Sequence, residues 1–205
     1  KAVLDRETVG TGDKALILGN ATDNTASGQY SLAAGSVTTA SGLGAIALGC
    51  SSTASGQYSF VWGYQSTASG VDSLALGDMN TSSDRSAMAI GFSNIASGKY
   101  SISIGCGLQT IHNFEMAVGK YNTHTGEPTD NNIIFSVGCG TSDTSRANAI
   151  EVWSDGKTYI NGSLEVGGVL TITQSGSSNV YTKAEVSTMI AKKSDEWTEV
   201  SSGFT

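Results

Sequence analysis

The chain has 205 residues, of which 14% are charged and 39% are apolar, and it contains 26 glycines but one proline. This composition is too apolar for a disordered chain, and the net charge of −7 disfavours binding to nucleic acid or insertion into an anionic membrane, which need Lys/Arg clusters or long apolar runs. Abundant glycine without proline favours repeated tight turns between strands.

Residues 1–14 are interpreted as an N-terminal lead-in to a repeat. A glycine then recurs every 14 residues after a first interval of 16. Of the four residues before each glycine, the second is large and apolar, the fourth is large in all but one case, and the first and third are mostly Ser or Ala. This period-two alternation predicts a short β-strand before each glycine. The glycines are Gly19, Gly35, Gly49, Gly63, Gly77, Gly91, Gly105 and Gly119.

A second pattern lies half a repeat away and predicts a turn. It reads Ala-Ser-Gly from residues 26, 40, 54, 68 and 96, and Ser82-Ser-Asp84 in one repeat. Asp tolerates a left-handed backbone better than most residues, so Asp84 is compatible with the same turn.

Two strands and two turns in 14 residues make one coil, and residues 15–119 therefore predict an all-β solenoid. Because a 14-residue coil encloses little volume, we expect the large side chains to fill its interior and the small Ser/Ala face to approach a neighbouring subunit; the reverse assignment is the alternative. Such a thin coil depends on stacking and on burial of a second face, which predicts an obligate homo-oligomer.

At Ser73–Gly77 and at Ala68–Gly70 the sequence resembles the head of trimeric autotransporter adhesins, the YadA-like left-handed parallel β-roll. This resemblance covers about half of the chain and implies a left-handed β-roll and a homotrimer. The same head module occurs in bacterial adhesins and in bacteriophage tail fibres.

The repeat ends after Gly119, and residues 120–173 are expected to form a β-rich connector. Residues 120–131 are interpreted as a surface loop. Strands are expected at 133–137, 149–153, 158–160 and 163–172, with hairpin turns at Asp155-Gly156 and Asn161-Gly162.

Residues 174–205 are expected to form a linker at 174–179, a short helix at about 182–193 and a tail. A capping box of Thr182 and Glu185 starts the helix. The segments 135–143, 148–162 and 180–186 resemble parts of phage and prophage tail fibres. The sequence shows no coiled-coil stalk and no C-terminal membrane barrel, which favours a phage fibre over an adhesin.

The three cysteines are Cys50, Cys106 and Cys139. Cys50 and Cys106 share one repeat position four coils apart, or ~19 Å by strand spacing, which excludes an intrachain disulfide because that needs Cα atoms within ~7 Å. Tyr64 and Phe92 hold the same position. A packed apolar role is therefore expected for the two cysteines, and chemistry across a subunit boundary is the alternative.

The only histidines are His112 and His124, and neither has a Cys or Glu at ligand spacing. We expect both to be structural or exposed; an ion held by symmetry-related copies is the alternative. Asp72, Asp78 and Asp84 match no calcium-binding repeat.

Threonines at equivalent positions, each with a serine two residues on, predict two hydroxyl ladders near the turns. A flat ordered-water surface of the ice-binding kind is the alternative. The threonines are Thr25, Thr39, Thr53, Thr67 and Thr81.

No residue is nominated as catalytic, cofactor-binding or metal-binding, and no enzyme activity or cofactor is expected. The predicted function is that of a virion structural protein: a trimeric tail fibre or baseplate-associated fibre segment that contacts other tail proteins and presents or contacts a host surface glycan or protein. The alternatives are the head of a bacterial trimeric adhesin on the cell surface, and a non-catalytic part of a glycan-degrading tailspike.

Overall fold

A computed structural model describes residues 7–19, 22–124 and 132–166, and these residues contain strands and turns but no helix. The chain divides into two units, Lys1–Leu164 and Glu165–Thr205. Only residues 165 and 166 of the second unit are described. The predicted linker at 174–179 and helix at 182–193 lie outside the described residues.

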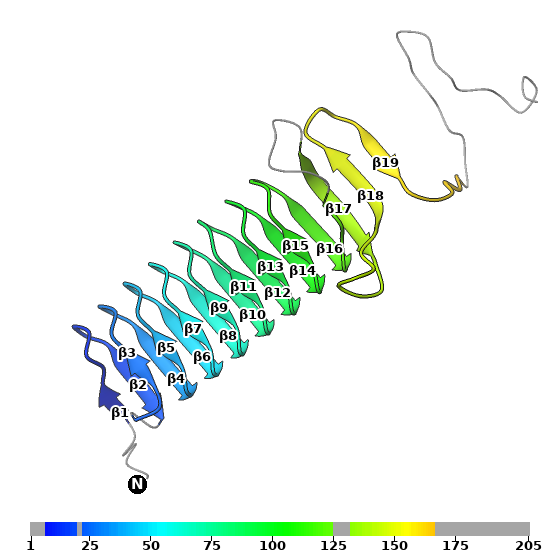
Figure 1. Cartoon of the computed structure of the whole chain (residues 1–205). Helices are drawn as coiled ribbons and strands as arrows, with labels where there is room; N and C mark the ends of the chain where they lie inside the picture. Colours follow the sequence, from blue (N-terminus) through cyan, green and yellow to red (C-terminus); the bar gives the residue numbers. More distant parts are fainter. Residues whose placement is uncertain (1–6, 20–21, 125–131, 167–205) are drawn as a thin grey trace, which may run out of the picture. The chain divides into compact units, whose positions relative to one another are not determined.

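Long strands, one from each coil, stack side by side in parallel (Figure 1). Each covers the predicted apolar-glycine segment, so the repeat is confirmed as the unit of the fold. The long strands are β2 (Leu16–Gly19), β4 (Leu32–Ser36), β6 (Ile46–Cys50), β8 (Phe60–Tyr64), β10 (Leu74–Asp78), β12 (Met88–Phe92), β14 (Ile102–Cys106) and β16 (Met116–Lys120).

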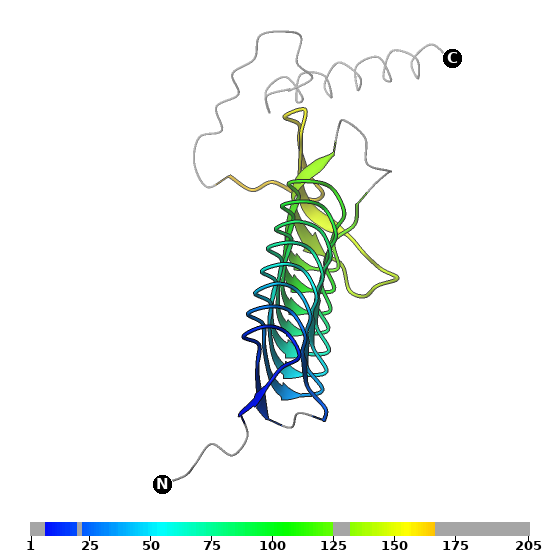
Figure 2. The same cartoon turned by 90° about the vertical axis from the view of Figure 1, so that its left-hand side faces the viewer.

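Short strands form the second wall of each coil, and the loops connecting the two walls are seen in Figure 2. They pair only with one another, so each coil contributes one strand to each of two sheets. About seven coils of 14 residues have both strands. The short strands are β3 (Thr25–Ala26), β5 (Thr39–Ala40), β7 (Thr53–Ala54), β9 (Thr67–Ala68), β11 (Thr81–Ser82), β13 (Ile95–Ala96) and β15 (Gln109–Thr110).

The strand glycine is required by the close stacking of coils. Gly49 pairs in register with Gly63. Gly49 has a φ of 113°, and a Cβ placed on it would lie 2.0 Å from the carbonyl oxygen of Gly63. Any other residue would therefore clash with the next coil's backbone and adopt a strained conformation.

The Ala-Ser-Gly segment begins in the short strand and continues into the turn. Its glycines do not have a left-handed backbone; Gly56 is needed because a Cβ would lie 1.9 Å from the carbonyl oxygen of Gly70. Asp84 is likewise not left-handed, so the reason predicted for that substitution is wrong. The left-handed residue of this turn comes two positions later, at Ser86, with a φ of 52°.

Small side chains fill the interior of the coils, which corrects the expectation that the large ones point inward. The first and third residues of the four are fully buried, whereas the second and fourth are half-buried or exposed. The two walls are too close for large side chains: the hydroxyl of Ser103 on β14 lies 2.9 Å from that of Thr110 on β15. The inward column of the long strands consists of Ile17, Ala33, Ala47, Val61, Ala75, Ala89, Ser103 and Ala117.

A buried polar ladder runs along one end of the interior. Each member lies three residues after a strand glycine, except Asn24, which lies five residues after Gly19. Most members donate a side-chain hydrogen bond to the carbonyl of a strand glycine in the next coil. Asn80 Nδ2, for example, lies 2.7 Å from the Gly91 oxygen, and Ser66 Oγ lies 2.8 Å from the Gly77 oxygen. These bonds satisfy carbonyls at the tight corner. The ladder consists of Asn24, Thr38, Ser52, Ser66, Asn80, Asn94 and Asn122, and it is interrupted by Leu108 at the equivalent position.

Other strands extend the long-strand sheet at both ends. β1 (Glu7–Val9) pairs antiparallel with β2, a pairing that the lead-in interpretation did not include. At the other end β17 (Ile133–Cys139) pairs parallel with β16, and β18 (Asn148–Trp153) and β19 (Thr158–Ile160) follow antiparallel.

The predicted hairpin turn at Asp155-Gly156 is confirmed, because it joins β18 to β19. Asn161-Gly162 forms a bend instead. Residues 163–166, the described part of the strand expected at 163–172, are not a strand.

Candidate interaction faces and a buried acid–histidine cluster

The outer face of the long-strand sheet is a continuous apolar surface, here called the apolar face. It consists of the second and fourth residues of each four, which the in-register pairing aligns in two columns. Trp62 is 63% exposed, and Ile104 and Leu16 also belong to the exposed part. The members in the central coils are Ile46, Leu48, Phe60, Trp62, Leu74, Leu76, Met88 and Ile90.

Continuous exposed apolar surfaces are typical of sites where proteins associate. The sequence identified the large residues of this face, but the prediction placed their side chains inside the coil and the structure places them outside. Full burial of a large apolar side chain contributes roughly 1.5–3 kcal/mol relative to full exposure, so a half-buried side chain of the apolar face has about half of that left to contribute.

Exposed aromatic side chains occupy the turn before the long strands. Tyr58 and Phe114 are more than half exposed and have left-handed backbones. The rings of Tyr100 and Phe114 stack with centroids 5.1 Å apart and an interplanar angle of 10°. Aromatic residues of successive coils are thus aligned at this pair, whereas Gly44, Asp72 and Ser86 hold the same position in other coils.

The outer face of the short-strand sheet has the predicted hydroxyl ladders. Thr25, Thr39 and Thr53 are register partners, and the row continues through Thr67 and Thr81 before Ile95 interrupts it. The serines two residues later are exposed from Ser27 to Ser83. This face is polar and uncharged, in contrast to the apolar face on the other wall.

Cys50 and Cys106 are both free and partly exposed, in the row next to the strand glycine. They are register partners of Tyr64 and Phe92 respectively, and each of these aromatic side chains is 46% exposed. The row is therefore only partly covered within one chain, where Cys106 Sγ lies 3.9 Å from the Tyr121 hydroxyl. Cys139 is also free, and it is exposed.

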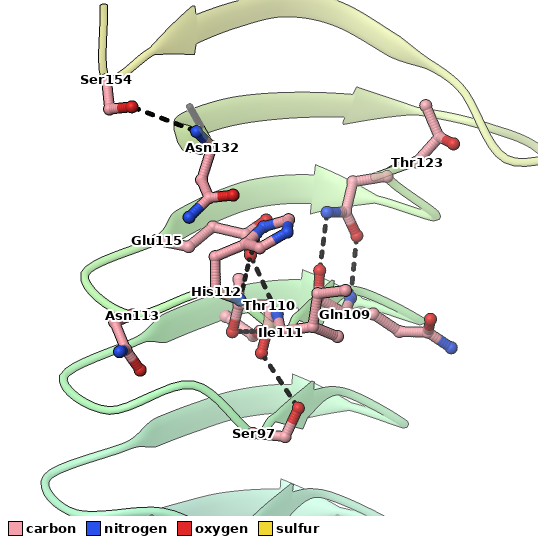
Figure 3. Close-up of polar contacts among 12 residues, drawn as sticks. Ser97, Gln109, Thr110, Ile111, His112, Asn113, Glu115, Thr123, Asn132 and Ser154 are labelled. Carbon is pink, nitrogen blue, oxygen red and sulfur yellow. Dashed lines mark hydrogen bonds and ion pairs between the residues drawn. The ribbon is translucent and has the colours of Figure 1, made fainter. Parts of the chain in front are cut away.

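The two histidines are brought together with a carboxylate that the sequence analysis passed over. His112 is buried at 2% exposure and Glu115 at 0%, and His112 Nδ1 lies 3.2 Å from Glu115 Oε2 (Figure 3). The ring of His124 meets that of His112 edge-on with centroids 6.4 Å apart. The available signal was Glu115 itself, which stands where every other coil has Ser or Ala.

Burial shifts the pKa values in this cluster toward the neutral forms. It raises the pKa of Glu115 to about 7, although backbone N–H groups of His112 and Ile111 oppose the shift. Burial also lowers the pKa of His112, and it lowers that of His124 together with the positive charges of His112 and Arg146.

Within the described ranges, no three His, Cys, Asp or Glu side chains are arranged to hold a metal ion. Asp72, Asp78 and Asp84 form no such group among the described residues: Asp78 ends β10, and Asp72 and Asp84 lie in the turns before β10 and β12. Nor does any helix capable of spanning a membrane occur in the described part of the chain.

Comparison with known families finds a similarity for the repeat. The YadA head domain repeat, described as two copies, matches residues 26–52, 40–66, 54–78 and 85–105. The matched residues lie within the regular coils between β3 and β14, with a gap at 79–84 that contains β11. No curated protein matches the chain.

Proposed function

We propose that this chain forms the head of a homotrimeric, surface-exposed adhesin-like fibre. The observation that carries the proposal is the apolar face on coils that match the YadA head domain repeat. Repeats of this family suggest a trimeric, non-catalytic head on the cell surface.

In the proposed trimer the apolar faces of three copies pack around a common axis. The interior of each coil is already filled, so association is the means by which side chains such as Trp62 leave water. The opposite wall, with its threonine and serine ladders, then faces outward. A cyclic arrangement buries the apolar face of all three copies equally.

Binding to a host surface glycan or matrix protein is proposed to use the outward wall and the turns. Three equivalent copies on one stiff unit would strengthen weak individual contacts through avidity. The division into a head at 15–119 and a connector at 120–173 belongs to the same proposal.

The test is the mass of the folded protein, measured by size-exclusion chromatography with light scattering. We expect three times the mass of one chain. A folded species of one-chain mass at micromolar concentration would refute the proposal. Binding of the trimer, and not of a dissociated variant, to immobilised glycans or matrix proteins would support the adhesive role.

A second candidate is a trimeric segment of a phage tail fibre or baseplate-associated fibre, located in the virion. It is favoured by the resemblance of 135–143 and 148–162 to tail-fibre segments; these residues form most of β17, β18 and β19. Neighbouring genes for tail proteins would support this role, and a reading frame continuing into a membrane anchor would support the adhesin.

A non-catalytic part of a glycan-degrading tailspike is the remaining alternative. No catalytic residue is assigned in the proposal. Incubation with a panel of capsular polysaccharides should leave their chain length unchanged, and shortening of any polysaccharide would show that the non-catalytic assignment is wrong.

A further inference from the structure

The short-strand sheet ends at β15, whereas the long-strand sheet continues through β17. In earlier coils, backbone groups of the next coil satisfy the short strand and its turn. The Ile95 N–H donates to the Leu108 carbonyl, and the N–H groups of Ser97 and Gly98 donate to that of Thr110. A last strand without such partners would present free N–H and C=O groups to another chain.

The side-chain amide of Asn122 replaces the backbone of the next coil beside Gln109. The Gln109 N–H donates to Asn122 Oδ1 at 2.8 Å, and Asn122 Nδ2 donates to the Gln109 carbonyl at 2.8 Å. One amide thus supplies the acceptor and the donor that two peptide groups would supply. Asn122 is fully buried, so these bonds are shielded from water.

The carboxylate of Glu115 performs the same replacement at the following turn. Its Oε2 accepts the Ile111 N–H at 2.9 Å and the His112 N–H at 3.0 Å. These two donors correspond to those of Ser97 and Gly98 one coil earlier, which share the Thr110 carbonyl. Figure 3 shows Glu115 beside His112 and Ile111, next to the paired Gln109.

We infer that Asn122 and Glu115 form a side-chain cap that ends the short-strand sheet and blocks the addition of a second copy of this chain at β15. The cap satisfies both backbone groups of Gln109 and the N–H groups of the two residues after Thr110. It works without a further strand because the Asn122 amide presents a donor and an acceptor, as a peptide group does, and the Glu115 carboxylate presents the acceptor that the next coil's carbonyl would supply.

The test is the full-length double variant N122L/E115S, with both substitutions taken from the repeat itself. Leu108 and Ser101 hold these positions one coil earlier, so each new side chain has a size that the roll accommodates. We expect the amide protons of Gln109, Ile111 and His112 to exchange at least about tenfold faster, since their acceptors are lost. We also expect light scattering to detect species larger than the wild-type assembly as protein concentration rises.

The control is N94L, which removes a ladder asparagine from the interior. Its neighbouring short strands keep their backbone pairing, so no larger species should form. E115Q is the second control, because it keeps an acceptor oxygen and should retain slow exchange at Ile111 and His112.

Unchanged exchange in the double variant would show that Asn122 and Glu115 are not the cap. Faster exchange without larger species would show that the cap does not block association. If the double variant fails to fold, the same measurements on N122L and E115S singly decide between these outcomes. None of them depends on the stoichiometry of the wild-type assembly.

Discussion

Replacing Trp62 by alanine should dissociate the proposed trimer. Trp62 is 63% exposed in one chain, and a tryptophan side chain offers ~250 Å² at most, so ~150 Å² is available for burial in the apolar face. At ~25 cal/mol per Å² this corresponds to an upper limit of ~4 kcal/mol per subunit.

Three copies give an upper limit of ~12 kcal/mol per trimer, or about nine orders of magnitude in the trimerisation constant. Because this constant scales with the square of the chain concentration at the midpoint, that concentration should rise by up to about four orders of magnitude. Sedimentation velocity from nanomolar to high micromolar concentration measures the midpoint directly.

The matched control is Tyr58→Ala in the same coil. Tyr58 is 57% exposed but lies in a turn beside the apolar face. We expect Y58A to sediment as the wild type does. An unchanged midpoint in W62A, or an equal change in both variants, would refute packing through the apolar face.

Two further predictions concern stability. Because the pKa of Glu115 is raised from 4.5 to about 7, the folded state binds its proton more tightly; this contribution to the free energy of unfolding is present at acid pH and is lost as the pH rises through 7. Urea unfolding should therefore show E115Q gaining on the wild type, by at most ~3 kcal/mol, between pH 5 and pH 8, and parallel pH profiles would contradict this. Gly49→Ala should destabilise the roll by more than ~2 kcal/mol in thermal unfolding because its Cβ would meet the Gly63 oxygen, whereas Gly162→Ala, with open space around it, should be nearly neutral.

The coil repeat was predictable because it leaves two independent signals, a glycine at fixed spacing and alternation of large and small residues. The direction of the side chains was not, since alternation defines two faces without saying which one is inside. The contact between the Ser103 and Thr110 hydroxyls decides it, because it shows how close the walls are.

The candidate site was predictable only in part. The hydroxyl ladders and the separation of Cys50 from Cys106 follow directly from the repeat. Glu115 was missed because its role depends on a backbone partner that is absent at the last coil, and periodicity describes only what recurs. Asn122 was missed for the same reason, although asparagines occur at its position in earlier coils.

Because successive coils pair in the same register, the number of coils can change without changing the alignment of their side chains. Inserting 14 residues adds one coil and ~4.8 Å of height while every column of side chains stays aligned. Recombination between coils could therefore lengthen or shorten the head without redesigning the surface that holds subunits together. An insertion of 7 residues would instead place a long-strand segment opposite a short one, so only whole coils are interchangeable.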